Sequence, residues 1–402
     1  MRLSTPSIIA LLCLAEVLTM LGVFSFPALM PVFQDAWGLT NTEAGWISGV
    51  TFGAYALAAP VLISLTDRVD ARWLFCFGAG LAAMAAAGFA WLAEGFLSAL
   101  VLRALGGIGL AGTYMPGLRM LVDRIPREAQ ARAVPFYTAS FSLGTALSYF
   151  VSGQVGAALG WPWAFGAAAA GAAVAAIVAM VQRPVTPQRP EGPPVRLLDF
   201  RPVLRNRPAM GYVLGYAAHT WELFAFRSWV VAFLVAAGGA AATGWSAPAT
   251  VATWGALVAM AASIGGAEVA SRLGRPRTVM VYMVLSCSVA AGLGFTIGLP
   301  YGVVAGLSIL YSGLIQLDSA ALTSGAVEMA EAGRRGATLA VHSLLGFLAG
   351  FLGPLALGMT LDAGGWGWAF FSVAAVALLG PLGMWWGSRA QNLSLAKRPS
   401  GA

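Results

Sequence analysis

Twelve apolar segments, each long enough to cross a lipid bilayer, follow one another along this chain. We expect them at residues 8–32, 44–65, 73–93, 96–119, 133–156, 162–181, 209–236, 248–270, 278–297, 300–323, 336–360 and 366–387. Each holds about the 20 residues that cross a hydrocarbon core of about 30 Å as a helix. Every backbone polar group must be paired within lipid, and no alternating strand pattern is present, so the segments are predicted to be helices.

Composition excludes a soluble domain. Of the 402 residues, 59% are hydrophobic and only 10% are charged. A soluble fold could not hide so much apolar surface, so the chain is predicted to be an all-α integral membrane protein. The three cysteines lie in apolar segments, and no disulfide framework is expected.

Basic residues mark one side of the predicted membrane. Of 23 Lys and Arg, 21 lie outside the apolar segments, in alternate connections and at both termini. The opposite connections carry only acids, among them Asp35, Glu43, Glu94 and Asp362. This asymmetry predicts that both termini are cytoplasmic. The net charge of +7 then reflects topology and contact with anionic lipid, and nucleic acid is not an expected partner. Nearly all basic residues are Arg, which points to a GC-rich bacterial source and its inner (cytoplasmic) membrane.

A polar connection divides the chain into two halves. Residues 182–208 carry seven prolines and six arginines. We therefore expect a six-helix bundle at 1–182, a cytoplasmic linker at 183–208, a second six-helix bundle at 209–388 and a cytoplasmic tail at 389–402. Short basic turns at 66–72 and 271–277 follow the second segment of each half, as an internal repeat predicts.

Three local patterns resemble the major facilitator superfamily. Residues 63–72 follow that family's pattern Gly-x-x-x-Asp-Arg-x-Gly-Arg-Arg at Asp67, Arg68 and Arg72, but Ile63, Asp70 and Ala71 depart from it. In the fourth segment, an arginine and the glycines of residues 103–112 look like the family's Arg-plus-glycines motif. The turn at 271–277 retains Arg272, Gly274 and Arg275 as a degenerate copy of the first pattern.

The resemblance covers essentially the whole chain and implies alternating access between two six-helix bundles. It also implies that the basic turns form a charge network that steadies one conformation. The residues assigned to this network are Asp67, Arg68, Arg72, Asp123, Arg272 and Arg275. Asp123, at the end of the fourth segment, is expected to pair with an arginine of the 66–72 turn.

Ionisable residues inside the membrane define the candidate site. The clearest are Glu16, Arg103, Glu222, Arg227 and Asp318, on segments 1, 4, 7 and 10. A charge at the bilayer centre costs about 2.5–3.5 kcal/mol on insertion scales, so it faces a partner or an aqueous path. This spacing along the chain suggests that the four helices share one polar cavity.

Glu16 and Arg103 are predicted to lie at similar depth. As a functional pair, Glu16 would bind the coupled proton and Arg103 would tune it; the alternative is a fixed structural ion pair. In segment 7, His219 and Glu222 are i,i+3 neighbours that can touch. They would exchange protons while Arg227 holds an anion, or else Glu222 and Arg227 simply neutralise each other.

The remaining site predictions concern segment 10 and nearby tyrosines. Asp318 is a candidate gate or second proton site, with a local capping or ion-pair role as the alternative. Tyr114, Tyr216 and Tyr311 are candidate substrate contacts together with the two arginines.

The function we expect is secondary active transport of a small solute, most simply a small anion, by proton-coupled alternating access. Two alternatives stay open: a proton-coupled drug or cation antiporter, and a non-transporting membrane assembly or sensor protein. There is no Walker motif, no Cys/His metal set and no plausible Ser-His-Asp spacing, so no enzyme activity, cofactor or metal is expected. The expected partners are the substrate, protons and the bilayer, and the protein is expected to be a monomer.

Overall fold

The computed structural model describes residues 4–187, 200–331 and 334–396, with side chains up to residue 390, and these residues contain helices and no strand. The first half comprises α1 (Thr5–Met20), α2 (Ser25–Trp37), α3 (Asn41–Leu65), α4 (Ala71–Leu92), α5 (Phe96–Val122), α6 (Arg127–Leu159) and α7 (Trp161–Met180). The second half comprises α8 (Arg201–Arg205), α9 (Arg207–Ala236), α10 (Pro248–Leu273), α11 (Arg275–Leu293), α12 (Tyr301–Gln316), α13 (Ser319–Glu328), α14 (Arg335–Ala377) and α15 (Leu379–Ala396). Short 3-10 turns lie at η1 (Gly239–Ala241), η2 (Gly244–Ser246) and η3 (Gly294–Thr296).

Nine helical segments of the described chain are long and apolar enough to cross a membrane. The last of them, Arg335–Ala390, has 56 residues and reverses at Gly365, whose φ of 77° is non-helical, so it holds two of the expected spans. The helices α6 and α9, with 33 and 30 residues, are also long enough but contain more polar residues. The all-helical membrane fold is confirmed, and the described helices fit the twelve expected spans.

Two of the expected spans are interrupted. The first span breaks at residues 21–24 between α1 and α2, and the tenth breaks at residues 317–318 between α12 and α13. Hydropathy predicted continuous helices at both places. Broken helices are tolerated at membrane depth only where other groups pair the freed backbone atoms. The partners of these breaks therefore belong to the candidate site.

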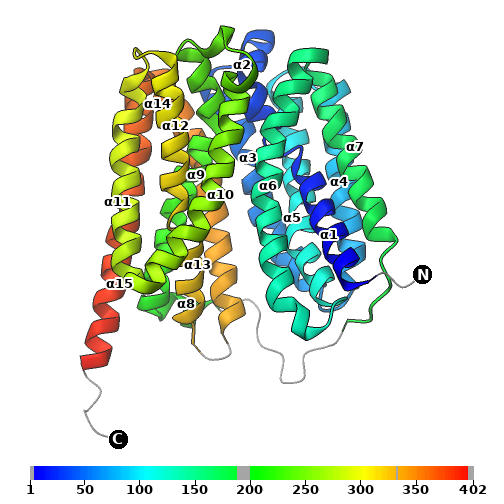
Figure 1. Ribbon diagram of the computed structural model, residues 1–402, viewed down its shortest axis with the longest axis vertical. Helices are drawn as coiled ribbons and strands as arrows, with labels where there is room; N and C mark the ends of the chain where they lie inside the picture. Colours follow the sequence, from blue (N-terminus) through cyan, green and yellow to red (C-terminus); the bar gives the residue numbers. More distant parts are fainter. Residues whose placement is uncertain (1–3, 188–199, 332–333, 397–402) are drawn as a thin grey trace, which may run out of the picture.

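The helices form two groups that lie side by side, α1 to α7 and α8 to α15 (Figure 1). They meet where α3 packs on α14, α6 on α10 and α2 on α9. Close approach of α3 requires glycine, because a Cβ added at Gly45 would lie 2.7 Å from the Pro354 carbonyl oxygen.

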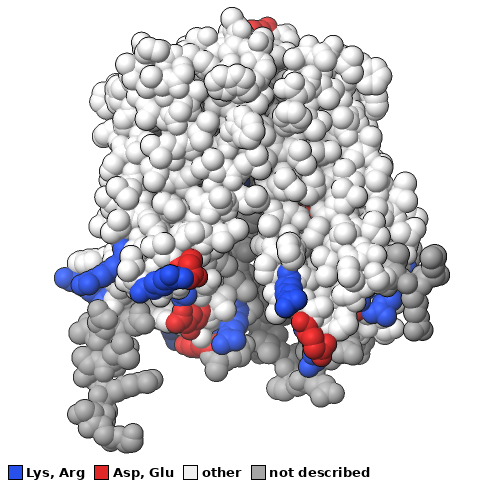
Figure 2. All heavy atoms as spheres, in the orientation of Figure 1, with Lys and Arg blue, Asp and Glu red and all other residues white. Residues whose placement is uncertain are grey.

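Charged side chains gather at one end of the molecule, and α1 begins and α15 ends toward that end (Figures 1 and 2). Figure 2 also shows a hollow between the two groups on this half. Within the described residues, the side-chain hydrogen bonds that join the groups involve Asp362, Tyr149 and Gln154. All three lie at mid-depth or toward the opposite end, so the groups are joined there and diverge toward the basic end.

Candidate functional site

Glu16 is fully buried in α1, with 0% of its surface exposed. The Tyr137 hydroxyl of α6 donates a hydrogen bond of 2.8 Å to its Oε2 atom. The same hydroxyl lies 3.1 Å from the backbone carbonyl oxygen of Tyr114 in α5. No described residue pairs with Glu16 Oε1. The carboxyl is therefore held at one oxygen only, between α1, α5 and α6.

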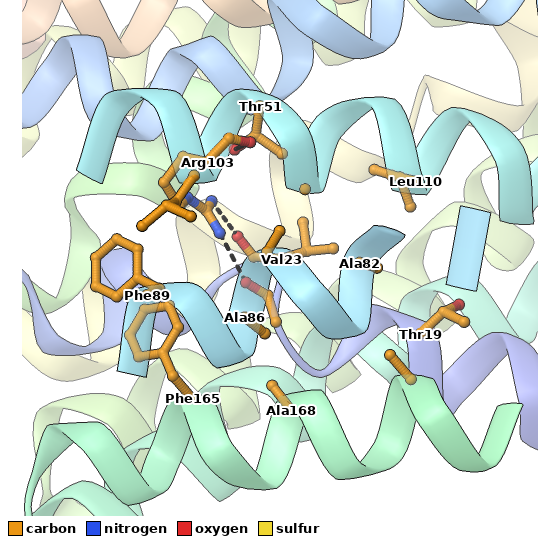
Figure 3. A pocket seen from close by; sticks show the side chains of 15 residues that line it. Thr19, Val23, Thr51, Ala82, Ala86, Phe89, Arg103, Leu110, Phe165 and Ala168 are labelled. Carbon is orange, nitrogen blue, oxygen red and sulfur yellow. Dashed lines mark hydrogen bonds between the residues drawn. The ribbon is translucent and has the colours of Figure 1, made fainter. Parts of the chain in front are cut away.

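Arg103 does not contact Glu16, so neither the expected tuning of Glu16 by Arg103 nor the alternative of a structural ion pair is seen. Its Nη1 and Nη2 atoms donate to the carbonyl oxygens of Gly22 and Val23, at 2.7 and 2.6 Å (Figure 3). These carbonyls belong to the break between α1 and α2. Ser148 pairs the rest of the break, donating to Leu21 O at 2.6 Å and accepting from the Phe24 N–H at 3.0 Å. Arg103 thus stabilises the backbone of the broken helix and adjoins a cavity of about 40 Å³.

Glu222 is buried between α9, α11 and α12, and both of its carboxyl oxygens are paired. The Tyr311 hydroxyl donates to Oε1 at 2.9 Å, and Ser286 Oγ donates to Oε2 at 3.1 Å. Tyr311 therefore contacts Glu222 directly, whereas it was expected to contact substrate. The expected contact between Glu222 and His219 is not formed.

His219 instead faces Asp318, with 2.7 Å between Nδ1 and Oδ1. Asp318 stands at the break between α12 and α13 and makes no side-chain capping bond. Of the two local roles given as alternatives for Asp318, this geometry agrees with the ion pair and not with helix capping. The Tyr216 ring stacks at 3.8 Å from the His342 ring and lies 5.8 Å from that of His219. These rings join α9, α12–α13 and α14 in one buried polar cluster.

Arg227 is a buried cation without a counter-ion among the described residues. Only 4% of its surface is exposed, and its Nε and Nη2 atoms have no hydrogen-bond partner there. Its Cζ atom lies 5.9 Å from the centre of the Phe24 ring, and its backbone carbonyl accepts a hydrogen bond from Tyr149. Phe24 and Tyr149 belong to the other group of helices. Arg227 therefore lies where the two groups meet and is not neutralised by Glu222.

Tyr114 and Tyr216, the other predicted substrate contacts, are half-buried on α5 and α9. The Tyr114 ring packs on Phe141 within the first group, with 4.9 Å between ring centres. Tyr55 of α3 packs across the junction on Phe347 of α14, with 4.0 Å between ring centres. Tyr137, Ser286 and Tyr55 were missed, because a hydroxyl in an apolar segment gives no signal of its partner.

A family model described as Major Facilitator Superfamily matches residues 12–353. The chain belongs to the Major Facilitator Superfamily. Membership makes it a multi-pass membrane protein of a transport family, with a small-molecule substrate as the expected cargo.

Several curated superfamily members are similar over part of the chain. Protein spinster homolog 1 of Homo sapiens is 23% identical over 240 residues, which is 57% of this chain and 45% of that protein. A probable 4-methylmuconolactone transporter of Cupriavidus pinatubonensis is 30% identical over 32% of this chain and 30% of its own length. The D-galactonate transporter of Escherichia coli O6:H1 is 29% identical over 33% of this chain and 30% of its own length. Each match spans less than half of the relative.

Solved superfamily structures share the fold over nearly the whole chain. A bacterial homologue of the human lysosomal transporter spinster, crystallised inward-facing and unoccupied, gives a TM-score of 0.78 at 16% identity and covers 99% of both chains. The nucleoside transporter NupG gives a TM-score of 0.79 at 12% identity, covering 94% of this chain and 99% of its own. At these identities the likeness shows the fold alone.

The superfamily turn at 66–72 centres on a residue that departs from the family pattern. Arg124 Nη2 contacts Asp70 Oδ1 at 2.7 Å, Arg72 Nε lies 3.4 Å from Oδ2, and the Val185 N–H donates at 2.8 Å. Burial opposes ionisation of Asp70, but the hydrogen bonds from Arg124 and from the Val185 and Arg72 backbones outweigh it and lower its pKa. From the sequence alone, Asp70 is only a departure from the glycine of the family pattern.

The other ion pairs of the predicted network each lie within one group of helices. Arg119 contacts Asp123 at 2.9 Å and Asp67 at 3.6 Å, so the expected pairing of Asp123 with an arginine of the turn is wrong. Arg68 is exposed and forms no ion pair with a described residue. In the second half, Arg272 contacts Glu268 at 2.6 Å and Arg275 contacts Glu328. Each of these pairs stays within one group of helices.

At the opposite end, one acid joins the groups. Asp362 accepts hydrogen bonds from the backbone and side chain of Asn41, at 3.2 and 2.8 Å, and from those of Thr42, at 2.8 and 2.6 Å. This contact fixes the start of α3 to α14. The sequence predicts that Asp362 lies on the acidic side but indicates no partner for it.

Proposed function

We propose that this superfamily member is a proton-coupled secondary transporter that moves a small organic anion by alternating access. The observation that carries the proposal is Arg227, a buried guanidinium at the junction of the two groups that has no counter-ion among the described residues. A buried, unpaired charge is costly, and an anionic substrate that reaches it would remove much of that cost.

The buried carboxyls supply the proton sites of the proposal. Glu16 and Glu222 lie in different groups, and each is held by a tyrosine hydroxyl. His219, three residues before Glu222 on α9, faces Asp318 and forms a further ionisable site with it. Binding a proton together with an anion would lower the net charge that the site carries while the two groups rearrange. Arg103 is engaged with backbone carbonyls, so the proposal assigns anion binding to Arg227, with Tyr114 and Tyr216 as further contacts.

Alternating access is supported by the way the two groups are joined. They are in contact at the acidic end and diverge at the basic end, which the positive-inside rule assigns to the cytoplasm. The proposal therefore takes this conformation as open to the cytoplasm, with both termini there. We further propose that the protein acts as a monomer in the cytoplasmic membrane of a bacterium.

The relatives favour an organic anion over a cation. Of the curated proteins that match, one is named for D-galactonate, a carboxylate, and another for 4-methylmuconolactone. The matches are partial, so they support the substrate class and not the individual solute.

The test is proton movement in proteoliposomes with pH-sensitive dyes inside and outside. Small organic anions are added one at a time, followed by lipophilic cations. We expect the outside medium to become alkaline with at least one anion, and expect that response to vanish in Glu222→Gln and Glu16→Gln. Glu94→Gln, at an exposed acid of the acidic end, is the matched control and should respond like the wild type. Proton counterflow with cations would instead establish the antiporter, and no proton movement with any solute would reject proton coupling.

A further inference from the structure

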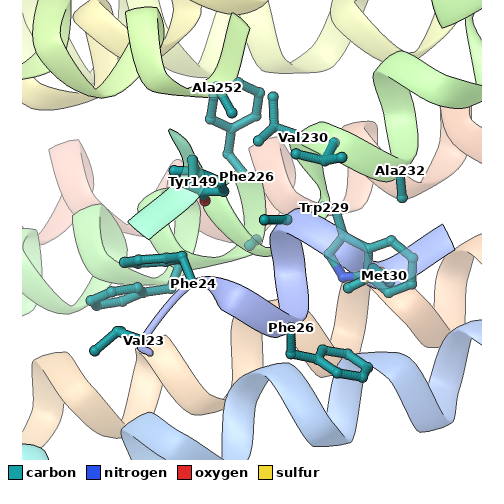
Figure 4. Close-up of a cluster of buried hydrophobic side chains, with 14 of the residues drawn as sticks. Val23, Phe24, Phe26, Met30, Tyr149, Phe226, Trp229, Val230, Ala232 and Ala252 are labelled. Atoms are coloured by element: carbon teal, nitrogen blue, oxygen red, sulfur yellow. The ribbon is translucent and has the colours of Figure 1, made fainter. Parts of the chain in front are cut away.

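A small cavity adjoins Arg227 between α6, α9, α10 and α12. Its lining includes Tyr149, Phe226, Arg227, Ser308 and Ser312, and the rest of the wall consists of Val, Ala and Gly. The Phe24 ring stacks on Tyr149 at 5.2 Å, and Phe226 lies beyond Tyr149 (Figure 4). The cavity therefore combines one cation with hydroxyl groups inside an apolar and aromatic wall.

The hydrogen-bonding capacity of this cavity is narrow. Arg227 offers Nε–H and Nη2–H, two donors of the fork that binds a carboxylate in bidentate fashion. Ser312 makes no hydrogen bond with a described residue and can add a donor, whereas Ser308 already donates to Val304 O at 2.8 Å. The Tyr149 hydroxyl is engaged with the Arg227 carbonyl. The free donors therefore suit a single carboxylate group.

The wall beyond these donors disfavours a second polar group. Burying a hydroxyl or carboxylate without a partner costs several kcal/mol, so a polyhydroxylated acid or a dicarboxylate would lose affinity there. An aromatic or cyclic body, in contrast, can pack on Phe24, Tyr149 and Phe226, since ring pairs are favourable at the separations these rings show.

Resting on the proposed function, we propose that this cavity binds the carboxylate of a monocarboxylic acid whose body is an aromatic or cyclic apolar ring. Arg227 and Ser312 hold the carboxylate, and Phe24, Tyr149 and Phe226 contact the ring. The cavity has a volume of about 10 Å³ in this conformation, which is too small for a carboxylate. The contact of Tyr149 and Phe24 with Arg227 must therefore open for the acid to enter. Because that contact joins the two groups of helices, substrate binding and their movement are coupled.

The test is equilibrium binding of radiolabelled benzoate to the purified full-length protein in detergent. Unlabelled cyclohexanecarboxylate should compete with benzoate. Benzamide, which lacks the charge, and gluconate, which adds hydroxyls, should compete at least tenfold more weakly. Arg227→Lys keeps the charge but loses the fork, and should weaken benzoate binding at least tenfold. Ser312→Ala should weaken it about threefold, whereas Ser288→Ala, an exposed serine of α11, should leave it unchanged.

Two results would overturn this inference. One is gluconate competing as well as cyclohexanecarboxylate, and the other is wild-type benzoate binding by Arg227→Lys. Failure to bind benzoate, combined with Glu222-dependent proton movement on addition of another anion, would reject this substrate class and keep the proposed transport. Absence of proton movement with every anion would reject the proposed function itself. Size-exclusion elution of each variant, compared with the wild type, separates lost binding from misfolding.

Discussion

Replacing Asp362 tests whether the contact at the acidic end sets the balance between conformations. Its carboxylate accepts four hydrogen bonds from Asn41 and Thr42, two of them from backbone N–H groups in the first turn of α3. Such N–H groups have no partner inside their own helix, and the positive end of the helix dipole also favours an acid there. The contact therefore acts as an N-terminal cap supplied by the opposite group of helices.

The size of the effect follows from that description. Removing a capping side chain costs about 0.5–2 kcal/mol, and solvent exposure of Asp362 keeps the value within that range. Since about 1.4 kcal/mol corresponds to a tenfold change in an equilibrium constant, Asp362→Ala should shift the ratio of closed to open states at the acidic end by about 2- to 30-fold. The population of the open state should increase, because the lost hydrogen bonds form only when the two groups of helices are in contact at this end.

Distance measurement by double electron–electron resonance reports this ratio. Spin labels at the exposed positions Glu94 and Trp245 place one probe on each group at the acidic end, after replacement of the three native cysteines. We expect a longer distance to gain population in Asp362→Ala. The matched control is Asp35→Ala, since Asp35 is exposed and contacts no described partner. An unchanged distance distribution in Asp362→Ala, or an equal change in Asp35→Ala, would refute the capping argument.

Three further predictions follow from the buried and interfacial charges. Glu222→Gln should abolish uptake driven by a pH gradient while exchange of substrate for substrate continues, as counterflow assays would reveal. Asp70→Asn should lower stability by about 3 kcal/mol, because the buried Arg124 loses its counter-ion, and a melting curve at pH 7 measures this. Because the pKa of Asp70 is lowered in the folded state, its contribution to stability is complete above about pH 3.9, the pKa of an unperturbed Asp. That contribution is lost as the pH falls through the folded-state pKa. The melting temperatures of the wild type and of Asp70→Asn should therefore converge in that acid range. Arg103→Met should leave two buried carbonyls unpaired at about 1–3 kcal/mol each and lower kcat with little change in KM, and Arg103→Lys should recover part of both losses.

The spans were predictable because a membrane imposes a simple rule on sequence. The predicted segments 44–65 and 96–119 lie within three residues of the ends of α3 and α5. Length and hydropathy are enough for this, since the bilayer fixes both. The breaks within spans 1 and 10 escaped prediction, because apolar residues continue across them. Arg103 and Ser148, which lie on other helices, pair the backbone of the first break. The local sequence around the break gives no indication of such distant hydrogen-bonding partners.

Burial of the site residues was also predictable, but their partners were not. Glu16, Glu222, Arg227, His219 and Asp318 are all buried, as expected of charges inside apolar segments. Depth in the membrane follows from position along a helix, whereas pairing depends on the rotation of each helix about its axis. Glu16 and Arg103 share a similar depth and yet have different partners for that reason.

The break in the first span links two parts of the proposed mechanism. Glu16 lies about one turn before the break, and Phe24, the last residue of the break, stacks on Tyr149 beneath Arg227. If α1 and α2 were one helix, a shift of α1 caused by protonation of Glu16 would move all of the span together. A break permits α1 and α2 to move separately, but free carbonyls in a membrane would destabilise it. Arg103 removes that instability with two short hydrogen bonds, which accounts for a buried arginine that neither binds an acid nor lies at the junction of the two groups.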